Sequence, residues 1–102
     1  MLYLPTVINT LVVQAPRLQQ KYPVQLLGVF GSVARSDNTS DSDLDLLVAF
    51  DETMSLNHLL DLSDELEQLF GAKIDLVTQQ QINPRYWTYI QPEIVYLPTK
   101  NS

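Results

Sequence analysis

Residues 31–45 read GSVARSDNTSDSDLD, a stretch that joins a glycine–serine pair to two alternating carboxylates. The apolar residues 26–30 before it predict a strand, so Gly31 and Ser32 fall where the chain turns toward a helix. Backbone N–H groups at such a turn point toward an anion, and Gly31 lets the main chain approach it closely. The Ser32 hydroxyl can donate a further hydrogen bond. The turn is therefore a candidate phosphate site.

Two carboxylates follow this turn at a fixed distance. Ten residues separate Ser32 from Asp43, and Asp43 and Asp45 open an apolar run that predicts a strand over residues 44–50. Because side chains alternate along a strand, both carboxylates lie on the same side of it. Such a pair suits a bound cation. A solvated strand end without a ligand is the alternative interpretation.

The order Gly-Ser, ten residues, Asp-x-Asp resembles the nucleotidyltransferase superfamily of the DNA polymerase beta type. It is most similar to the smallest branch, the MNT domain proteins, over roughly residues 26–77, and the ending Glu93-Ile94-Val95-Tyr96-Leu97 also looks like that branch. The resemblance implies a minimal nucleotidyltransferase fold of α/β (α+β) class. The sequence departs from the family at Ser36, where glycine is frequent, and at Val33, where a basic residue is frequent.

A third carboxylate, Asp75, lies inside the apolar residues 73–78, which predict a strand. On a central strand its charge would be desolvated, which is costly unless an arginine, a hydrogen-bond network or a metal compensates. The resemblance places the family's third catalytic carboxylate here, and a structural carboxylate is the alternative. Three converging carboxylates would raise their own pKa values and attract a cation.

Mg²⁺ is the cation that we expect, because it takes oxygen ligands and bridges carboxylates to nucleotide phosphates. Two such ions, ~3.5–4 Å apart, can stabilise the attacking and leaving oxygens together. We therefore expect Asp43, Asp45 and Asp75 to be the catalytic and metal-binding residues, with ATP as substrate. By this logic Asp75 helps to ionise or orient the attacking hydroxyl.

Arg35 follows the glycine–serine pair, and two interpretations of it stay open. Its guanidinium can bind a phosphate beside Gly31 and Ser32, or it can fix the loop by pairing with a carboxylate such as Asp37 or Asp41. Gly31, Ser32 and Arg35 are the nucleotide-binding candidates.

The remaining elements are predicted from helical periodicity and caps. We expect a first helix from Pro5 that Pro16 interrupts or kinks, a helix capped by Ser55 and ended by Gly71, and a brief helix after Asn83. A last strand over residues 93–97 precedes a polar tail. The result would be a small mixed β-sheet with helices mainly on one face.

Two further groups of residues have open roles. An aromatic cluster with one guanidinium either caps the small core or forms a partner interface, where such residue types are enriched; its members are Arg85, Tyr86, Trp87 and Tyr89. We expect His58 to be an exposed residue and not a metal ligand, because no second histidine or cysteine accompanies it.

Composition limits the partners. At 102 residues we expect one domain, residues 1–102, too small to select its acceptor unaided. Without cysteine, a secretory start or an apolar run near the ~20 residues of a membrane span, we expect a cytoplasmic protein with no membrane contact. The net charge of −6 opposes direct binding of a nucleic-acid backbone.

The resemblance to MNT proteins implies the antitoxin of a toxin–antitoxin pair whose partner is a HEPN-domain ribonuclease toxin. In that family AMP passes from ATP to a tyrosine hydroxyl of the toxin, which is thereby neutralised. Two alternatives stay open: a non-catalytic antitoxin that masks the toxin by binding, and a nucleotidyltransferase that acts on a small molecule or on RNA. The residues by themselves lead as far as Mg²⁺-dependent nucleotidyl transfer to a hydroxyl.

Overall fold

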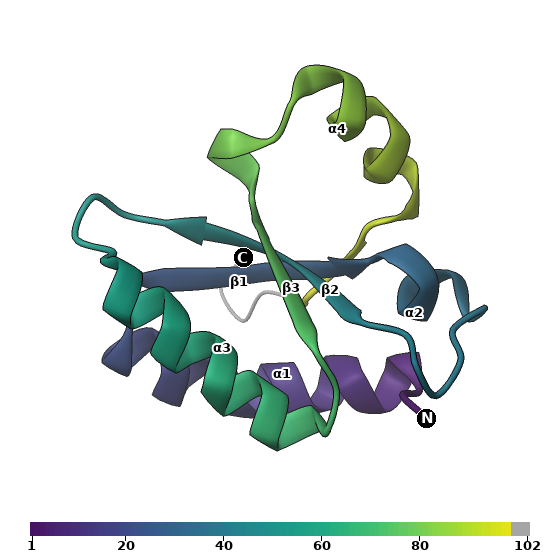
Figure 1. The fold of residues 1–102 in the computed structure, drawn as a ribbon, viewed down its shortest axis with the longest axis horizontal. Coiled ribbons are helices and arrows are strands. Elements are labelled where there is room, and N and C mark those ends of the chain that lie inside the picture. Colours follow the sequence, from purple (N-terminus) through teal and green to yellow (C-terminus); the bar gives the residue numbers. More distant parts are fainter. Residues whose placement is uncertain (99–102) are drawn as a thin grey trace.

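The computed structural model describes residues 1–98, so most of the predicted polar tail lies outside the described residues. Figure 1 shows the chain as helices and strands that alternate along the sequence. In order they are α1 (Leu4–Lys21), β1 (Val24–Phe30), α2 (Gly31–Arg35), β2 (Leu44–Phe50), α3 (Leu56–Phe70), β3 (Ile74–Thr78), the 3₁₀ helix η1 (Gln79–Gln81), α4 (Pro84–Ile90), the 3₁₀ helix η2 (Gln91–Glu93) and β4 (Val95–Tyr96).

The strands form one four-stranded mixed sheet in the order β3-β2-β1-β4. β1 is antiparallel to both β2 and β4, whereas β3 runs parallel to β2 after the α3 crossover. The α/β (α+β) class with a small mixed sheet is confirmed. β3 lies at the sheet edge, however, so the expectation that Asp75 sits on a central strand is wrong.

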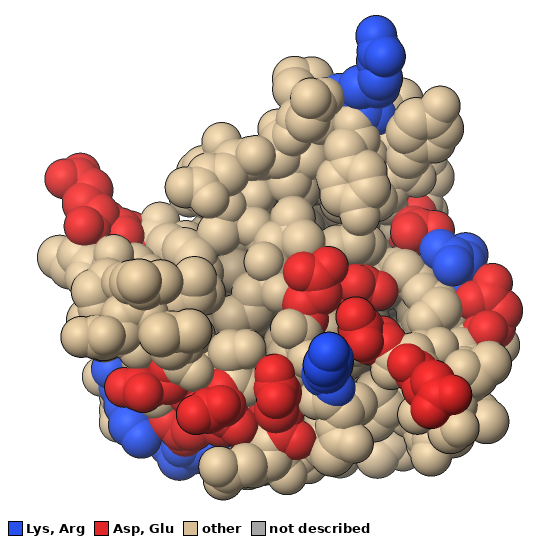
Figure 2. Space-filling view, viewed as in Figure 1, with Lys and Arg blue, Asp and Glu red and all other residues tan. Residues whose placement is uncertain are grey.

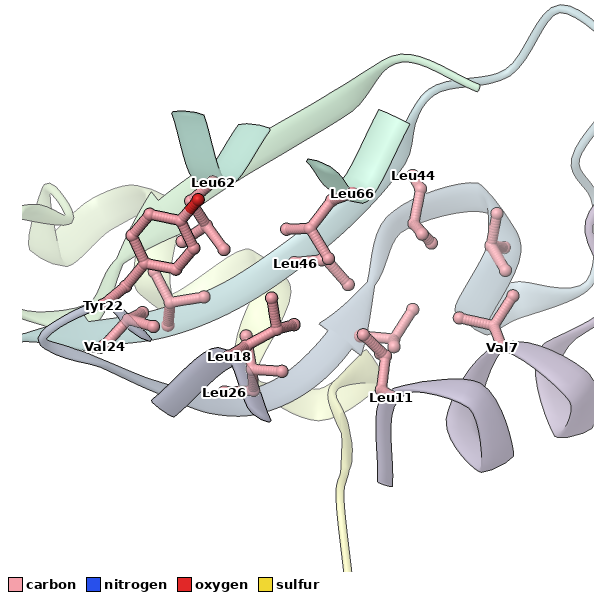
Figure 3. Close-up of a cluster of buried hydrophobic side chains, with 13 residues drawn as sticks. Val7, Leu11, Leu18, Tyr22, Val24, Leu26, Leu44, Leu46, Leu62 and Leu66 are labelled. Carbon is pink, nitrogen blue, oxygen red and sulfur yellow. The ribbon is translucent and has the colours of Figure 1, made fainter. Parts of the chain in front are cut away.

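One face of the sheet is covered by α1 and α3, and α4 stands on the opposite side (Figure 1). Figure 3 shows the resulting core, in which Leu11 and Leu18 of α1 and Leu62 and Leu66 of α3 gather around Leu46 of β2. All five are buried. Removing such a side chain from water stabilises the fold by about 1.5–3 kcal/mol.

A smaller cluster holds α4 against the other face of the sheet. It consists of buried Phe30, Leu47 and Ile90, and Trp87 of α4 packs against it. This cluster places α4 over the end of β1, at Phe30, and the middle of β2, at Leu47.

α1 continues through Pro16, so the predicted interruption is wrong. A proline inside a helix removes one backbone hydrogen bond and costs about 3 kcal/mol. Pro16 itself is exposed, whereas Leu11 and Leu18 on either side of it are buried against the sheet. Packing of this face therefore outweighs the local cost.

The last strand is shorter than the predicted 93–97, because Gln91–Glu93 form a 3₁₀ helix. β4 pairs with β1 only at Gly28 and Val29. A Cβ atom at Gly28 would lie 2.7 Å from the carbonyl oxygen of Val95, so glycine is needed for this close approach.

The predicted caps of α3 are confirmed. The Ser55 hydroxyl accepts from the backbone N–H of His58, and Gly71 ends the helix in a left-handed conformation. His58 is half-buried rather than exposed, and its Nδ1 accepts from the Ser55 N–H to complete a capping box. Within residues 1–98 no helix is long and apolar enough to cross a membrane.

Candidate active site

The turn between β1 and α2 requires glycine for two reasons. Gly31 has a φ of +75°, a left-handed conformation that residues with a side chain rarely adopt. A Cβ atom at this position would also lie 2.1 Å from Oδ2 and 2.9 Å from Cγ of Asp45. The Gly31 backbone therefore lies directly against Asp45 of β2, which brings the predicted phosphate turn next to one of the predicted site carboxylates.

Strand pairing brings two of the three predicted carboxylates side by side. Asp45 and Asp75 are register partners in the parallel pair of β2 and β3, and Asp45 also pairs with Phe30 at the end of β1. Asp43 is exposed and directly precedes β2, near enough for its charge to act on Asp45. The three carboxylates therefore lie at the same end of the sheet as the Gly31 turn.

The arrangement of the carboxylates disfavours the ionised form of Asp45. Burial raises the pKa of Asp45 to about 6, with further contributions from the charge and hydrogen bond of Asp75 and from the charges of Asp43 and Glu93. The desolvation expected for Asp75 falls instead on Asp45, because Asp75 lies exposed on the edge strand. A cation beside Asp45 would favour its ionised form.

Arg35 pairs with carboxylates in the structure. Its Nε donates to Oδ2 of Asp37 at 3.0 Å, and its Nη1 donates to Oε2 of Glu93 at 2.9 Å. Oε1 of Glu93 accepts from the backbone N–H of Gly31 at 3.2 Å. Of the two acidic partners considered for Arg35, Asp37 is bonded to it here.

Glu93 is a site residue that sequence reasoning missed. The sequence predicts a strand at this residue, and its only distinguishing feature there is a carboxylate at the start of an apolar segment. Its proximity to Gly31 depends on the pairing of β4 with β1, which local patterns do not reveal.

The other turn residues fit the local backbone. Ser32 is half-buried in the first turn of α2, and Val33 is fully buried in the core. Ser36 has a φ of +64° where α2 ends, which explains why glycine suits this position in the family that the sequence resembles.

The four residues of the predicted aromatic cluster differ in burial. Trp87 packs on the core cluster beneath α4, whereas Tyr86 and Tyr89 are 46% and 76% exposed and Arg85 is also exposed. Burial raises the pKa of Tyr86, and the charges of Asp45, Asp75 and Glu93 raise it further. Tyr86 therefore lies near enough to these carboxylates for their charges to act on it. Figure 2 shows acidic side chains on the face of the molecule below α4.

The donor set fits Mg²⁺ bound together with a nucleotide. Within residues 1–98, no three His, Cys, Asp or Glu side chains are grouped closely enough to hold an ion by themselves. Mg²⁺ is usually held by one or two carboxylates, with the remaining ligands from water and substrate phosphates. The adjacent Asp45 and Asp75, with Asp43 nearby, match that requirement.

Comparison with known proteins identifies the family of the chain. The family described as "Nucleotidyltransferase domain" matches residues 13–96. Protein adenylyltransferase MntA of Thermococcus cleftensis is 34% identical over 97 residues, which cover 95% of this chain and 98% of the relative.

Two solved structures share the fold. One, described as a minimal nucleotidyltransferase, has a TM-score of 0.68 at 34% identity and covers 90% of this chain and 95% of its own. The other belongs to a toxin–antitoxin complex with AMP-PNP and has a TM-score of 0.70 at 19% identity, covering 92% of this chain and 74% of its own. With the family match over most of the chain, these likenesses show that the protein belongs to the nucleotidyltransferase domain family and is a nucleotidyltransferase.

Proposed function

We propose that this protein is an antitoxin that transfers AMP from ATP to a tyrosine hydroxyl of a HEPN-domain ribonuclease toxin. The observation that carries the proposal is the convergence of the Gly31 turn with Asp45 and Asp75 at one end of the sheet. The name of the Thermococcus cleftensis relative supports a protein acceptor, and the resemblance to MNT proteins supplies the toxin class and the tyrosine.

In the proposed reaction the tyrosine oxygen attacks the α-phosphorus of ATP. The bond from that phosphorus to the oxygen bridging to the β-phosphate breaks, and pyrophosphate leaves. Mg²⁺ held by Asp43, Asp45 and Asp75 would neutralise phosphate charge and stabilise the attacking and leaving oxygens.

The protein's own groups have separate tasks in this scheme. The Gly31–Ser32 turn holds the phosphates through the Ser32 hydroxyl and the backbone N–H groups that follow Gly31, because the N–H of Gly31 itself donates to Glu93. Asp75, exposed at the sheet edge, is open to an incoming acceptor and takes the proton from its hydroxyl. Asp45, held beside Gly31, orients the nucleotide relative to that acceptor.

The first test replaces the carboxylates without changing their size. With labelled ATP, Mg²⁺ and purified toxin, Asp43→Asn and Asp45→Asn should each lower the transfer rate by about 10²-fold or more. Asp41→Asn is the matched control, because Asp41 is exposed in the same loop. Transfer at the wild-type rate in the Asp43→Asn, Asp45→Asn double variant would refute the site assignment.

The second test separates catalysis from masking. A catalytic antitoxin silences excess toxin when ATP is present, whereas a masking antitoxin needs one copy per toxin and no ATP. Titrating ribonuclease activity against antitoxin, with and without ATP, therefore decides between them. Label that appears on RNA or on a small molecule, with none on the toxin, would identify a different acceptor.

A further inference from the structure

One carboxylate, that of Glu93, ties together the two ends of α2. Its Oε1 accepts from the N–H of Gly31, the first residue of the helix, and its Oε2 accepts from Nη1 of Arg35, the last. Both bonds cross 58 or more sequence positions. They connect the turn of the active site to the C-terminal segment of the chain.

The turn depends on this support because α2 is only five residues long. The first N–H groups of any helix lack intrahelical partners, and a helix of this length is not stable without outside contacts. The Glu93 side chain is 23% exposed, so its bonds are largely shielded from water. Without the carboxylate, the half-shielded N–H of Gly31 would lose its acceptor.

The backbone of Glu93 is held in place by the pairing of β4 with β1. It ends η2, two residues before Val95, which pairs with Val29 of β1. Its backbone is therefore fixed relative to the end of β1. This anchoring favours a permanent support over a side chain that swings aside when ATP arrives.

The bond between Glu93 and Arg35 limits the ability of Arg35 to bind a phosphate. Its guanidinium contacts two carboxylates, those of Glu93 and Asp37, and the hydrogen bond that it donates to Glu93 is the main cause of its raised pKa. A cation shared between two anions has little remaining attraction for a phosphate.

We propose that Glu93 is a positioning residue for the nucleotide. It holds the Gly31–Arg35 turn in the shape that receives the triphosphate, and it retains Arg35 as a structural cation outside the phosphate site. This inference rests on the nucleotide binding in the proposed function. The rival role for Glu93 is that of a placeholder, which occupies the phosphate site and must leave before ATP binds.

The test measures binding of AMP-PNP with Mg²⁺ to the isolated protein by calorimetry, without any acceptor. Glu93→Ala should weaken binding by about 10-fold or more, because the turn loses both bonds. Glu93→Gln keeps an oxygen that can accept from Gly31 and should restore affinity to within about 3-fold of wild type. Asp37→Asn, which removes the other carboxylate on Arg35, is the control and should change affinity by less than about 2-fold.

Three outcomes would overturn the inference. Tighter binding by Glu93→Ala would identify a placeholder, and unchanged binding by a folded Glu93→Ala would leave Glu93 without a role at the nucleotide. A loss of about 10-fold or more in Arg35→Gln that persists in the Glu93→Gln background would make Arg35 a phosphate ligand. If Glu93→Ala unfolds, the Glu93→Gln and Arg35→Gln cycle decides alone: the expected double variant binds no more weakly than the weaker single variant.

Failure of the proposed function gives a different pattern. Wild-type protein that does not bind AMP-PNP would refute both. Wild-type protein that binds it but does not label the toxin would refute only the acceptor, and the comparison of Glu93→Ala with Glu93→Gln would still support or overturn the role of Glu93.

Discussion

Gly31 and Gly71 have nearly the same backbone conformation but very different surroundings. Their φ angles are +75° and +66°. A Cβ atom would lie 2.1 Å from Asp45 Oδ2 at residue 31, whereas it would meet nothing within 4 Å at residue 71. Alanine at either position therefore tests backbone strain, and only at residue 31 does it also displace a site carboxylate.

We expect Gly71→Ala to lower the free energy of unfolding by about 1–2 kcal/mol and to leave the transfer rate unchanged. Gly31→Ala should carry the same strain and in addition lower transfer by about 10²-fold or more, because Asp45 must move. Thermal melts and ATP-labelling of both variants provide the measurement. A Gly31→Ala variant that transfers AMP as fast as Gly71→Ala would show that the Asp45 position is not critical.

Asp45 and Asp75 show how far single residues could be interpreted from the sequence. Each is one carboxylate in an apolar run, so local patterns single out both as candidates but cannot rank their burial. Their difference comes from strand order, since β2 lies inside the sheet and β3 at its edge. The sequence therefore predicts both as candidate site residues, and the fold determines which of the two bears the desolvation.

At the scale of elements, prediction succeeded where the information is local. The start and end of α3 follow from Ser55 and Gly71, which act within one turn of the helix. The extent of β4 and the continuity of α1 through Pro16 depend instead on packing against the sheet. Glu93 was missed for the same reason, because its partners Gly31 and Arg35 come from a distant part of the chain.

The contact between α1 and α3 includes a cluster of charges around Glu65. Arg17 Nη1 donates to Glu65 Oε1 at 2.8 Å, Lys21 Nζ lies 2.7 Å from Oε2, and the Tyr22 hydroxyl also donates to Oε2. The hydrogen bonds from Arg17, Lys21 and Tyr22 lower the pKa of Glu65 to about 2. The ionised form of Glu65 thus stabilises the packing of the two helices.

This shift predicts a loss of stability in acid. Because the folded pKa lies below the unfolded value of 4.5, the stabilisation is complete above about pH 5 and disappears as the pH falls toward 2. At pH 7 Glu65→Gln should lower the free energy of unfolding by about 1 kcal/mol, a modest figure because Arg17 and Lys21 are about half exposed.

Denaturant melts of wild type and Glu65→Gln at pH 7 and near pH 2 give the measurement. Asp64→Asn, an exposed change on the same helix, is the control and should be neutral at both values. A deficit of Glu65→Gln that stays constant down to pH 2 would count against the ionised carboxylate as its source.

The whole molecule has a net charge of −6, and several of its basic side chains form ion pairs with its own carboxylates. Of the five Lys and Arg residues within residues 1–98, Arg17, Lys21 and Arg35 are in ion pairs with carboxylates of the same chain. Figure 2 shows Asp and Glu side chains spread across the face below α4. Such a surface repels a nucleic-acid backbone and favours a protein partner with basic groups.

Substitutions in α4 can distinguish residues that stabilise the core from residues that contact a partner. Trp87 packs on Phe30, Leu47 and Ile90 and so attaches α4 to the sheet, whereas Tyr89 is 76% exposed. Trp87→Ala should lower the free energy of unfolding of the isolated protein by ~3 kcal/mol. Tyr89→Ala should change it by less than about 0.5 kcal/mol.

Affinity for the toxin then shows whether α4 is an interface. If the toxin covers the exposed side of α4, Tyr89→Ala should weaken the complex by ~2 kcal/mol although the free protein melts normally. Thermal melts of the free variants, followed by calorimetric titration of the toxin, separate the two effects. A Trp87→Ala variant with wild-type stability would contradict the core assignment. Unchanged toxin affinity in Tyr89→Ala would place the interface elsewhere. Tyr89 is too exposed to contribute to folding stability, so a change in its contacts with the toxin would appear directly in the affinity.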